Sequence, residues 1–413
     1  MKCRHCGSEL RLPFLDLGNA PPSNAYLTAE ALHGPEVWFP LRILVCENCW
    51  LAQTEDYAGR EAFFTHDYAY FSSFSSTWLD HAQRYVSKMI ERFHLGAAHC
   101  VVEVAANDGY LLQYVKRAGI PCYGVEPTVS TATAARDKGL EIVERFFGIE
   151  LAEELARAGR KADLMVANNV LAHVPDINDF VAGFARLLKP QGVVTFEFPH
   201  LLRMVRENQF DTAYHEHYSY LSLTAVQRIF HANGLDVFDV EEVSTHGGSL
   251  RVYAQRKDSG AHAHDPAVTA ILSRETNAGL TTSDFYRAFQ PAAERVKDDL
   301  LLFLLDAKRR GLKVGAYGAA AKGNTLLNFA GVRPDLLPYV VDKNPAKQDK
   351  YMPGSRIPIV DEAHLKKHRP DVIVILPWNL REEVAAQLSY AHQWHARFLT
   401  AVPALDLSPG DVT

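Results

Sequence analysis

Two closely spaced cysteine pairs constrain the start of this chain more than any other feature of the sequence. They are Cys3-x-x-Cys6 and, after 39 intervening residues, Cys46-x-x-Cys49. Two thiolates at this spacing bind one ion together, and two such pairs complete a tetrahedral shell of four sulfurs that suits zinc. We therefore expect a Zn(II)-binding module over residues 1–60, a stretch too short to fold reliably on a hydrophobic core alone.

Two disulfides or free thiols are the alternative interpretation of these cysteines. Disulfides would imply export, and the first residues lack an apolar signal region. The gap between the pairs is longer than usual, which predicts an excursion such as a hairpin between Leu15 and Leu44. Because four cysteines leave no open coordination position, we expect the zinc to be structural.

The charge balance argues against polyanionic partners. The 413 residues include 43 Lys and Arg against 49 Asp and Glu, a formal net charge of −6. Nothing in this balance favours nucleic acid or an anionic membrane, and no apolar run reaches the ~20 residues of a membrane span. We expect a cytoplasmic monomer of two or three domains with neither nucleic acid nor a membrane as partner.

Residues 61–255 show strand and helix patterns in alternation. A helix is predicted from about Ser75 to Phe93, because apolar residues recur there near helical spacing. Strands are then predicted at 101–105, 122–126, 141–144, 162–168 and 192–198, with helices at 110–115, 130–138 and 178–188. This alternation predicts a doubly wound parallel α/β sheet.

A second, smaller α/β unit is predicted within residues 256–413. Residues 255–285 are polar and poor in strand signal, which indicates a linker followed by a helix. A helix over 292–310 then precedes strands at 313–318, 339–342, 357–360 and 371–376. The chain thus combines a metal-binding module with two α/β domains.

A cofactor site is predicted where the first strand of the middle domain ends, since open α/β sheets bind ligands beyond the carboxyl ends of their strands. Glu103 to Leu112 reads E-V-A-A-N-D-G-Y-L-L, which is not the dinucleotide fingerprint G-x-G-x-x-G. It resembles the first motif of class I S-adenosylmethionine-dependent methyltransferases, in which a glycine stands in place of Ala105. The resemblance makes the turn residues cofactor ligands, namely Ala105, Asn107, Asp108 and Gly109.

Two later strand ends fit the same site. Glu126 closes the second strand about 20 residues after the turn, where a carboxylate accepts both ribose hydroxyls. The alternative for Glu126 is a solvated strand terminus. Asn168 begins the segment N-N-V-L-A-H ending in His173, a position that faces the methionine part of the cofactor in methyltransferases.

A cluster of histidine, glutamate and tyrosine follows at Tyr214-His215-Glu216-His217-Tyr218. A metal site, a packed domain interface and acid–base catalysis are all compatible with these residue types. A metal would need ligands from elsewhere, because neighbouring residues of a strand face opposite sides. Acid–base catalysis is the interpretation we favour, since histidine titrates near neutral pH.

Taken in order, these motifs resemble the sugar C-methyltransferases that act on nucleotide-linked 4-keto-6-deoxy sugars. The resemblance rests on the cysteine pairs, E-V-A-A-N-D-G-Y-L-L, N-V-L-A-H, Y-H-E-H, His246-Gly-Gly-Ser-Leu-Arg251 and Tyr317-Gly-Ala-Ala-Ala-Lys-Gly323. It implies a zinc-binding region, a class I methyltransferase domain and a C-terminal Rossmann-like domain. It also implies methylation at C3 of a dTDP- or GDP-linked sugar, or at C5 on the same scaffold.

The resemblance also implies residue roles. His217 would be the base that removes a proton beside the ketone, Glu216 would orient or polarise it, and Tyr214 would hydrogen-bond the sugar or its enolate. His173 and Tyr68 are further family positions in the catalytic pocket, with Tyr70 the less favoured choice for the place of Tyr68. His246 is expected among the substrate ligands.

The C-terminal unit resembles a domain that handles nucleotide sugars. Lys322 and Asn324 lie in a strand-to-helix turn, where backbone N–H groups favour a phosphate, and Arg251 is a separate candidate for the diphosphate. A domain that only packs against its neighbour is the alternative. The competing functions are an NAD-dependent oxidoreductase using this domain and a zinc-ribbon protein that binds macromolecules.

Overall fold

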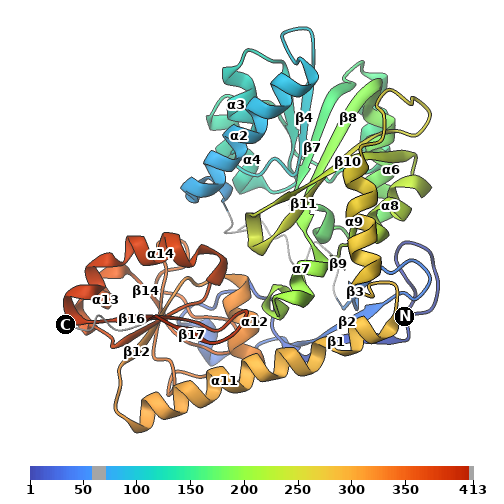
Figure 1. The fold of residues 1–413 in the computed structure, drawn as a ribbon. Helices are drawn as coiled ribbons and strands as arrows, with labels where there is room; N and C mark the ends of the chain where they lie inside the picture. Colours follow the sequence, from blue (N-terminus) through green and yellow to red (C-terminus); the bar gives the residue numbers. More distant parts are fainter. Residues whose placement is uncertain (58–70, 409–413) are drawn as a thin grey trace.

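The computed structural model describes residues 1–57 and 71–408, and these residues form three sheets. Figure 1 shows two α/β domains, with the N-terminal strands and the long helix α11 (Phe289–Arg309) running beneath both. Tyr68 and Tyr70 lie outside the described residues, so their places in the pocket stay predictions.

The middle domain holds a seven-stranded sheet in the order β10-β11-β8-β7-β4-β5-β6. The five strands β4 to β8 run parallel, and β11 and β10 add an antiparallel edge. The predicted α/β class is confirmed, but the sheet is mixed, because β8 is followed by the antiparallel pair that sequence analysis did not place. The bounds are β4 Val101–Val104, β5 Cys122–Val125, β6 Ile142–Val143, β7 Ala162–Asn168, β8 Leu188–Pro199, β10 Leu235–Val243 and β11 Ser249–Arg256.

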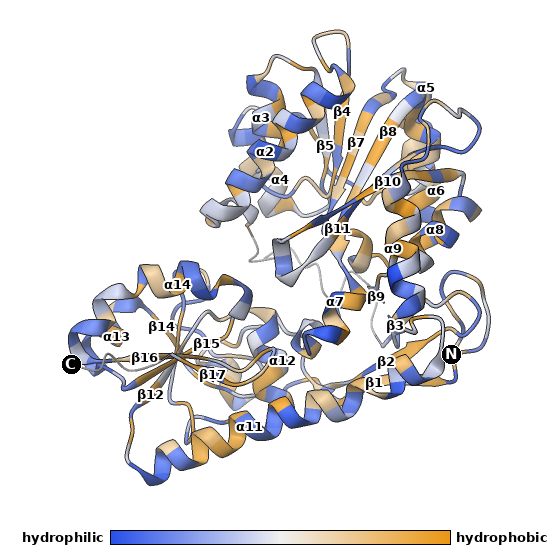
Figure 2. Cartoon of the chain, in the orientation of Figure 1, coloured by the Kyte–Doolittle hydropathy of each residue, from blue (hydrophilic) through white to orange (hydrophobic). Residues whose placement is uncertain are grey.

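Helices cover this sheet, and hydrophobic residues gather along its strands while the helices also carry hydrophilic ones (Figure 2). The helix predicted from about Ser75 to Phe93 is α2. The hydroxyl of Ser75 caps it by accepting a hydrogen bond from the Trp78 backbone, and His94 ends it in a left-handed conformation. The helices are α2 Ser76–Phe93, α3 Leu112–Arg117, α4 Val129–Asp137, α5 Ile149–Arg157, α6 Ile177–Leu187, α7 Leu201–Arg206, α8 Leu223–Ala232 and α9 Pro266–Asn277.

The N-terminal region shares its sheet and its cores with both domains. The predicted hairpin is present as β1 (Leu12–Ala20) and β2 (Phe39–Val45), followed by β3 (Ala52–Thr54), and β9 (Ser219–Tyr220) of the middle domain completes the sheet. Phe14 of β1 stacks on Phe289 of α11 with ring centroids 4.9 Å apart. The first residues are therefore no separate body, since their apolar side chains are buried against the rest of the chain.

The C-terminal domain carries a six-stranded sheet in the order β14-β13-β12-β15-β16-β17, parallel except for its last strand. Its predicted strands are all found. The bounds are β12 Val314–Tyr317, β13 Val340–Val341, β14 Ile359–Val360, β15 Val372–Ile375, β16 Arg397–Thr400 and β17 Asp406–Leu407, with α10 Ser283–Arg287, α12 Ala321–Phe329, α13 Glu362–His368 and α14 Arg381–Gln387.

The two α/β domains are joined directly by Trp378. Its indole N–H donates to Asp211 Oδ2 at 2.8 Å, and its ring lies against Gly247, where an added Cβ would be 2.4 Å from the indole. Gly247 also has φ +87°, so both space and backbone conformation require glycine there.

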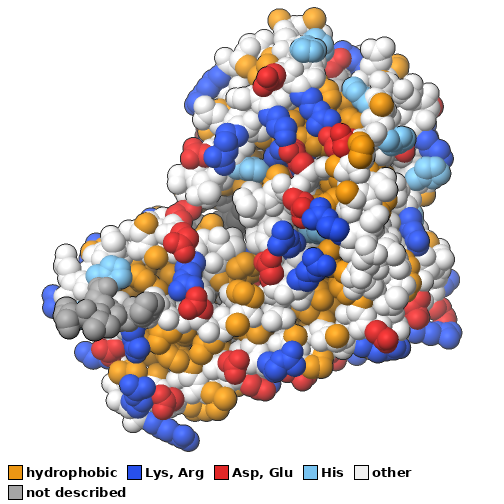
Figure 3. All heavy atoms as spheres, viewed as in Figure 1, with side chains coloured by type: hydrophobic (Ala, Val, Ile, Leu, Met, Phe, Trp, Pro, Cys, Tyr) orange, Lys and Arg blue, Asp and Glu red, His pale blue; other side chains and the backbone are white. Residues whose placement is uncertain are grey.

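The surface adds two observations. Lys and Arg alternate with Asp and Glu over the face in Figure 3, which therefore shows no large basic area. Among the described helices, none combines the length and the apolar character that crossing a membrane would need.

Candidate active site

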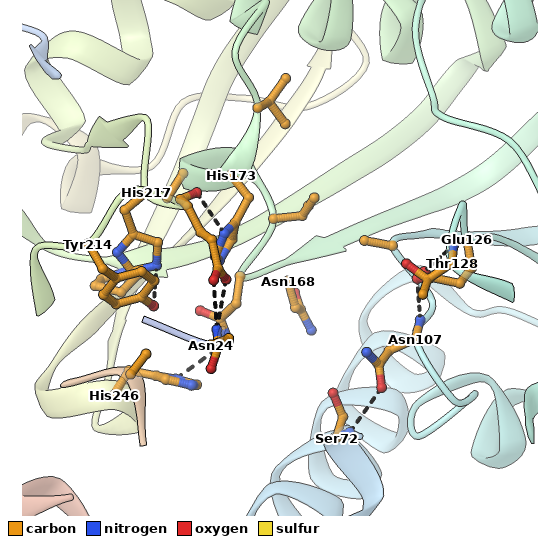
Figure 4. A pocket seen from close by; sticks show the side chains of 18 of the residues that line it. Asn24, Ser72, Asn107, Glu126, Thr128, Asn168, His173, Tyr214, His217 and His246 are labelled. Atoms are coloured by element: carbon orange, nitrogen blue, oxygen red, sulfur yellow. Dashed lines mark hydrogen bonds between the residues drawn. The ribbon is translucent and has the colours of Figure 1, made fainter. Parts of the chain in front are cut away.

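A pocket of about 380 Å³ lies where the three parts of the chain meet. Figure 4 shows two groups of side chains in it, with Asn107 and Glu126 in one, His173, Tyr214 and His217 in the other, and Asn168 between them. Most predicted site residues line this pocket, namely Ala105, Asn107, Glu126, Asn168, His173, Tyr214, Glu216, His217, His246 and Lys322.

Four predicted residues lie outside the lining. Gly109 and Asp108 support the turn from behind: a Cβ on Gly109 would be 2.3 Å from Leu140, and Asp108 faces the Lys138 ammonium at 3.4 Å. Asn324 is buried and donates to the backbone carbonyl of Ser23. Each of these three residues has a packing or hydrogen-bonding role in the structure.

Arg251 is the fourth residue, and its surroundings give no support to the predicted diphosphate contact. Its guanidinium is almost fully buried and pairs with Glu197 and Glu241, and the neighbouring carboxylates raise the pKa of Arg251 despite burial, which acts in the other direction. Glu197 in turn pairs with His81, which stacks on Trp78 of the pocket wall with ring centroids 5.0 Å apart. Arg251 thus stabilises the wall from behind.

The turn after β4 takes a conformation that explains its sequence motif. Ala105 has φ 59° and Asn107 has φ 49°, both in the left-handed region that favours glycine or asparagine. The glycine that related motifs carry at position 105 suits this backbone, and alanine occupies it here at a cost in strain. The turn brings the Asn107 backbone N–H to the carboxylate of Glu126 at 2.9 Å.

Glu126 holds two neighbouring loops together at the end of β5. One carboxylate oxygen accepts the Asn107 N–H and the other accepts the Thr128 N–H, each at 2.9 Å. Burial raises the pKa of Glu126, although these hydrogen bonds oppose the shift. Since each carboxylate oxygen has a second lone pair, both remain able to accept a ribose hydroxyl.

Asn168 gives a further sign that the pocket is built for a polar ligand. Asn168 is 7% exposed, and within the described residues neither of its amide atoms makes a hydrogen bond of ordinary geometry, although the Tyr110 hydroxyl lies nearby. A buried amide without partners is costly, so a ligand that supplies them is expected. The amino and carboxylate groups of S-adenosylmethionine fit that requirement, and Asn107, Glu126 and Asn168 would hold this cofactor.

The other end of the pocket contains a histidine in a defined tautomer. Nδ1 of His217 donates to the Thr212 carbonyl at 2.9 Å, which leaves Nε2 as the acceptor of the Tyr214 hydroxyl at 2.6 Å. Burial, followed by the neighbouring His173, keeps the pKa of His217 well below its ordinary value. The imidazole is therefore neutral at physiological pH and has a basic nitrogen on the side of Tyr214.

Two other histidines at this end are neutral as well. Burial lowers the pKa of His173 to about 4, and its Nδ1 donates to the backbone carbonyl of Glu216 at 3.0 Å. Burial and the nearby Lys322 lower the pKa of His246 to about 3, and its backbone φ is 55°. Three neutral imidazoles at this end provide hydrogen-bond donors and acceptors without positive charge.

Glu216 does not contact the imidazole of His217 as its predicted orienting role requires. Both nitrogens of that ring have other partners, and the Glu216 carboxylate lies 2.8 and 2.9 Å from the amide nitrogen of Asn24. The reason is the local fold: residues 215 and 216 form a turn and do not lie on a strand, and the Thr212 carbonyl is the group opposite Nδ1 of His217. Glu216 lines the pocket as an acceptor in its own right.

The C-terminal domain supplies cationic groups to this end. Lys322 lies in the first turn of α12, whose N-cap Ala320 makes no side-chain cap, and its ammonium donates to Asn379 at 3.1 Å. Burial lowers the pKa of Lys322 to about 8. Lys347, which sequence analysis did not single out, also lines the pocket. Two ammonium groups and an uncapped helix N-terminus favour an anion here.

The four predicted zinc ligands converge near the N-terminus. Their Sγ atoms all lie within 4.8 Å of one another, with 3.5 Å between Cys3 and Cys49 and between Cys6 and Cys46. A tetrahedron with zinc–sulfur bonds of about 2.3 Å has edges of about 3.8 Å. The arrangement therefore fits one zinc ion and needs no disulfide.

Comparison with known proteins decides the family. Family models match three successive parts of the chain: a zinc binding domain over residues 3–64, a methyltransferase domain over 78–240 and a C-methyltransferase C-terminal domain over 244–403. The C-methyltransferase NovU of Streptomyces niveus is 33% identical over 402 residues, which cover 97% of this chain and 95% of that protein. The chain belongs to the C-methyltransferase family.

Two further similarities cover smaller parts of this C-methyltransferase. The ubiquinone biosynthesis O-methyltransferase of Bartonella quintana is 30% identical over 98 residues, 23% of this chain and 38% of that protein. The structure of magnesium protoporphyrin IX methyltransferase from Synechocystis PCC 6803 is 17% identical, with a TM-score of 0.34 over 43% of this chain and 79% of that one. A score that low supports no conclusion.

The family models and the similarity to NovU confirm the predicted chemistry at the level of methyl donor and metal. The protein is an S-adenosylmethionine-dependent C-methyltransferase with a zinc-binding cluster of four cysteines. Sequence analysis missed Asn24, Asn169 and Lys347 in the pocket lining. The strand-end rule would have found Asn169, which follows β7 directly, whereas Asn24 and Lys347 reach the pocket only through contacts between domains.

Proposed function

We propose that this C-methyltransferase transfers the methyl group of S-adenosylmethionine to C3 of a nucleotide-linked 4-keto-6-deoxy sugar. The observation that carries the proposal is the Tyr214–His217 pair, a basic nitrogen and a phenol in the same pocket as Asn107 and Glu126, which we propose as cofactor ligands. Carbon methylation needs a carbanion, and a ketone makes the proton on the adjacent carbon acidic enough for a histidine to remove.

The methyl donor, when bound, supplies an electrophilic methyl group on a sulfonium. His217 takes the proton from C3 on Nε2, and the electron pair left behind forms the enolate. The hydrogen bond from His217 Nδ1 to the Thr212 carbonyl stabilises the imidazolium that results. Because burial holds the pKa of His217 low, the base is neutral at the start of each turnover.

In this proposal Tyr214 links proton removal by His217 to stabilisation of the enolate oxygen. Its hydroxyl covers Nε2 of His217 at 2.6 Å in the absence of substrate. In the proposed complex the hydroxyl turns its proton toward the 4-keto oxygen, which frees Nε2 and places a donor on the oxygen where the enolate charge develops. The carbon nucleophile then forms a bond to the methyl group as the bond from methyl to sulfur breaks, which leaves S-adenosylhomocysteine as a neutral thioether. The charge on the oxygen disappears as the ketone re-forms, and His217 afterwards releases its proton to solvent.

The nucleotide would lie toward the C-terminal domain. Lys322, Lys347 and the uncapped start of α12 form a region that favours the diphosphate. The N-terminal segment contacts the turn before α12, since the Ala319 carbonyl accepts a hydrogen bond from the Tyr26 hydroxyl at 2.6 Å. These contacts favour substrate binding between the domains, as opposed to a separate dinucleotide in the C-terminal sheet.

The test is incubation with labelled S-adenosylmethionine and a panel of dTDP-, GDP- and CDP-linked 4-keto-6-deoxy sugars. We expect label in one or more products, with NMR placing the new methyl group on C3. The matched control is the corresponding sugar with the 4-keto group reduced, which should accept no methyl group. Methylation at C5 would correct the position alone, and methylation of the reduced sugar or of an oxygen would refute the enolate route.

A further inference from the structure

A segment between the two cysteine pairs reaches the active pocket, and no motif pointed to it. Asn24 lies between β1 and β2, far from the methyltransferase motifs in sequence, yet it lines the pocket. Its amide nitrogen is 2.8 Å from one carboxylate oxygen of Glu216 and 2.9 Å from the other. The N-terminal region therefore contributes directly to the site.

The orientation of the Asn24 amide follows from its neighbours. Only the NH₂ group is compatible with a carboxylate at this distance, because the amide oxygen would repel it. The amide oxygen faces the Tyr26 hydroxyl at 3.4 Å. The side chain thus presents donors to Glu216 and carries no charge of its own.

The segment that carries Asn24 is fixed by the C-terminal domain. The carbonyl of Ser23 accepts a hydrogen bond from the buried Asn324 amide, and the Tyr26 hydroxyl donates to Ala319 at 2.6 Å. The Lys347 ammonium lies 5.3 Å from the centroid of the Tyr26 ring. Asn324, predicted as a substrate ligand, therefore acts on the backbone of this segment.

We propose that Asn24 is a positioning residue that holds the Glu216 carboxylate in place in the pocket through its two hydrogen bonds. The proposal rests on the proposed function, because it takes a hydroxyl of the sugar substrate as the group from which Glu216 would accept a hydrogen bond. A neutral donor is suited to this task, because it stabilises the anion without cancelling its charge. A cation at position 24 would neutralise the acceptor, and an acid would repel it.

Asn24→Asp is the decisive variant, since it has the same shape and replaces the donor by an acceptor. Two carboxyl groups at this distance cannot both ionise readily, so they share one proton and the pKa of the pair rises. The protonated pair reproduces the wild-type hydrogen bond, whereas the doubly ionised pair breaks it. Activity of Asn24→Asp should therefore be present at low pH and lost as pH increases through the raised pKa.

The other titratable groups around the pair are common to every variant, so they cancel in a ratio to wild type. They are Tyr26 of the N-terminal segment, His173 and His217 of the methyltransferase domain, and Lys322, Lys347 and Asp342 of the C-terminal domain. His217 stays neutral at mildly acidic pH because its pKa lies well below its ordinary value. Protonation of His217 therefore does not reduce the kcat/KM values measured near pH 6.

The first experiment compares kcat/KM of Asn24→Asp, Asn24→Ala and wild type between pH 6 and pH 8.5. We expect the ratio of kcat/KM for Asn24→Asp to that of wild type to fall at least ~10-fold over this range. The reason is that the ratio of singly protonated to doubly ionised pair falls tenfold for each pH unit. The Asn24→Ala ratio should be low and flat. The control is Asn19→Asp, the same substitution at an exposed position of β1, whose ratio should stay near one. A flat ratio for Asn24→Asp would overturn the proposal.

A second readout needs no turnover, so it separates this proposal from the proposed function. In protein labelled with ¹³C at the glutamate side-chain carboxyl carbon, the signal missing from Glu216→Gln identifies residue 216. Its titration should move to higher pH in Asn24→Asp and stay in place in Asn19→Asp. An unmoved titration would overturn the positioning role even if methyl transfer is found. If no sugar is methylated but the titration moves, the function fails and the Asn24 contact stands.

Discussion

Replacing Glu126 by glutamine tests the cofactor site most sharply, because the two side chains have the same shape. In the wild type each carboxylate oxygen accepts one backbone N–H at 2.9 Å, from Asn107 and from Thr128. Glutamine replaces one oxygen by an NH₂ group, which meets a backbone donor with another donor. The variant should therefore lose one loop contact and one ribose contact.

The expected magnitude follows from these two contacts. A hydrogen bond to a charged group contributes about 1.5–3 kcal/mol, so losing two costs about 3–6 kcal/mol. At about 1.4 kcal/mol for each tenfold change, the affinity for S-adenosylmethionine should fall about 10²- to 10⁴-fold. Calorimetric titration of the purified variant measures this directly.

The pH dependence supplies an internal check. Burial raises the pKa of Glu126, so cofactor affinity in the wild type is present above that pKa and is lost as pH decreases through it. Glu126→Gln should lack this loss. Glu141→Gln, at an exposed side chain paired with Arg160, is the matched control and should bind normally. An affinity of Glu126→Gln within threefold of wild type would refute the assignment.

Three further predictions follow from the packing, the histidine site and the metal cluster. Gly247→Ala should lower the free energy of unfolding by about 1–3 kcal/mol, because the added Cβ collides with Trp378. Gly311→Ala is the control for backbone strain, since Gly311 has a similar φ and open space around it, and an equal loss of stability in the two variants would contradict the collision. The kcat of the wild type should stay level as pH decreases from 8 to 6.5, since the pKa of His217 lies well below 6.5, and an inflection near 6.5 would indicate another base. Elemental analysis should find about one zinc per chain in protein purified without chelators. Removing the zinc with a chelator should weaken the near-ultraviolet circular dichroism of the N-terminal region, and a metal-free protein with an unchanged spectrum would contradict the structural role.

The strand ends of the middle sheet were predictable from the sequence because local patterns determine them. A buried strand followed by a turn brings Asn107, Glu126 and Asn168 to one sheet edge whatever the remaining chain does. The helix near Ser75 was predictable in the same way from the helical spacing of its apolar residues, and the structure shows Ser75 as its N-cap. These features depend on neighbours in sequence, so a single chain is enough to read them.

The features that sequence analysis missed depend on contacts between distant segments. Asn24 carries no motif, and only the domain arrangement brings it to Glu216. The partner of His217 was assigned to the adjacent glutamate, whereas the fold places the Thr212 carbonyl there. Arg251 is predicted from the sequence as a ligand of the diphosphate, but in the fold it is buried and pairs with carboxylates on the two neighbouring strands. In each case the partner is fixed by tertiary packing.

Hydrogen exchange at the carbon beside the ketone tests the central claim most directly. The substrate found in the labelling panel is incubated in deuterated water with enzyme and S-adenosylhomocysteine, so that no methyl group is transferred and only proton removal is followed. Wild type should introduce deuterium at C3, and His217→Asn should do so at least ~100-fold more slowly while binding the cofactor with unchanged affinity. Exchange at the wild-type rate in His217→Asn would contradict the assignment of His217 as the base.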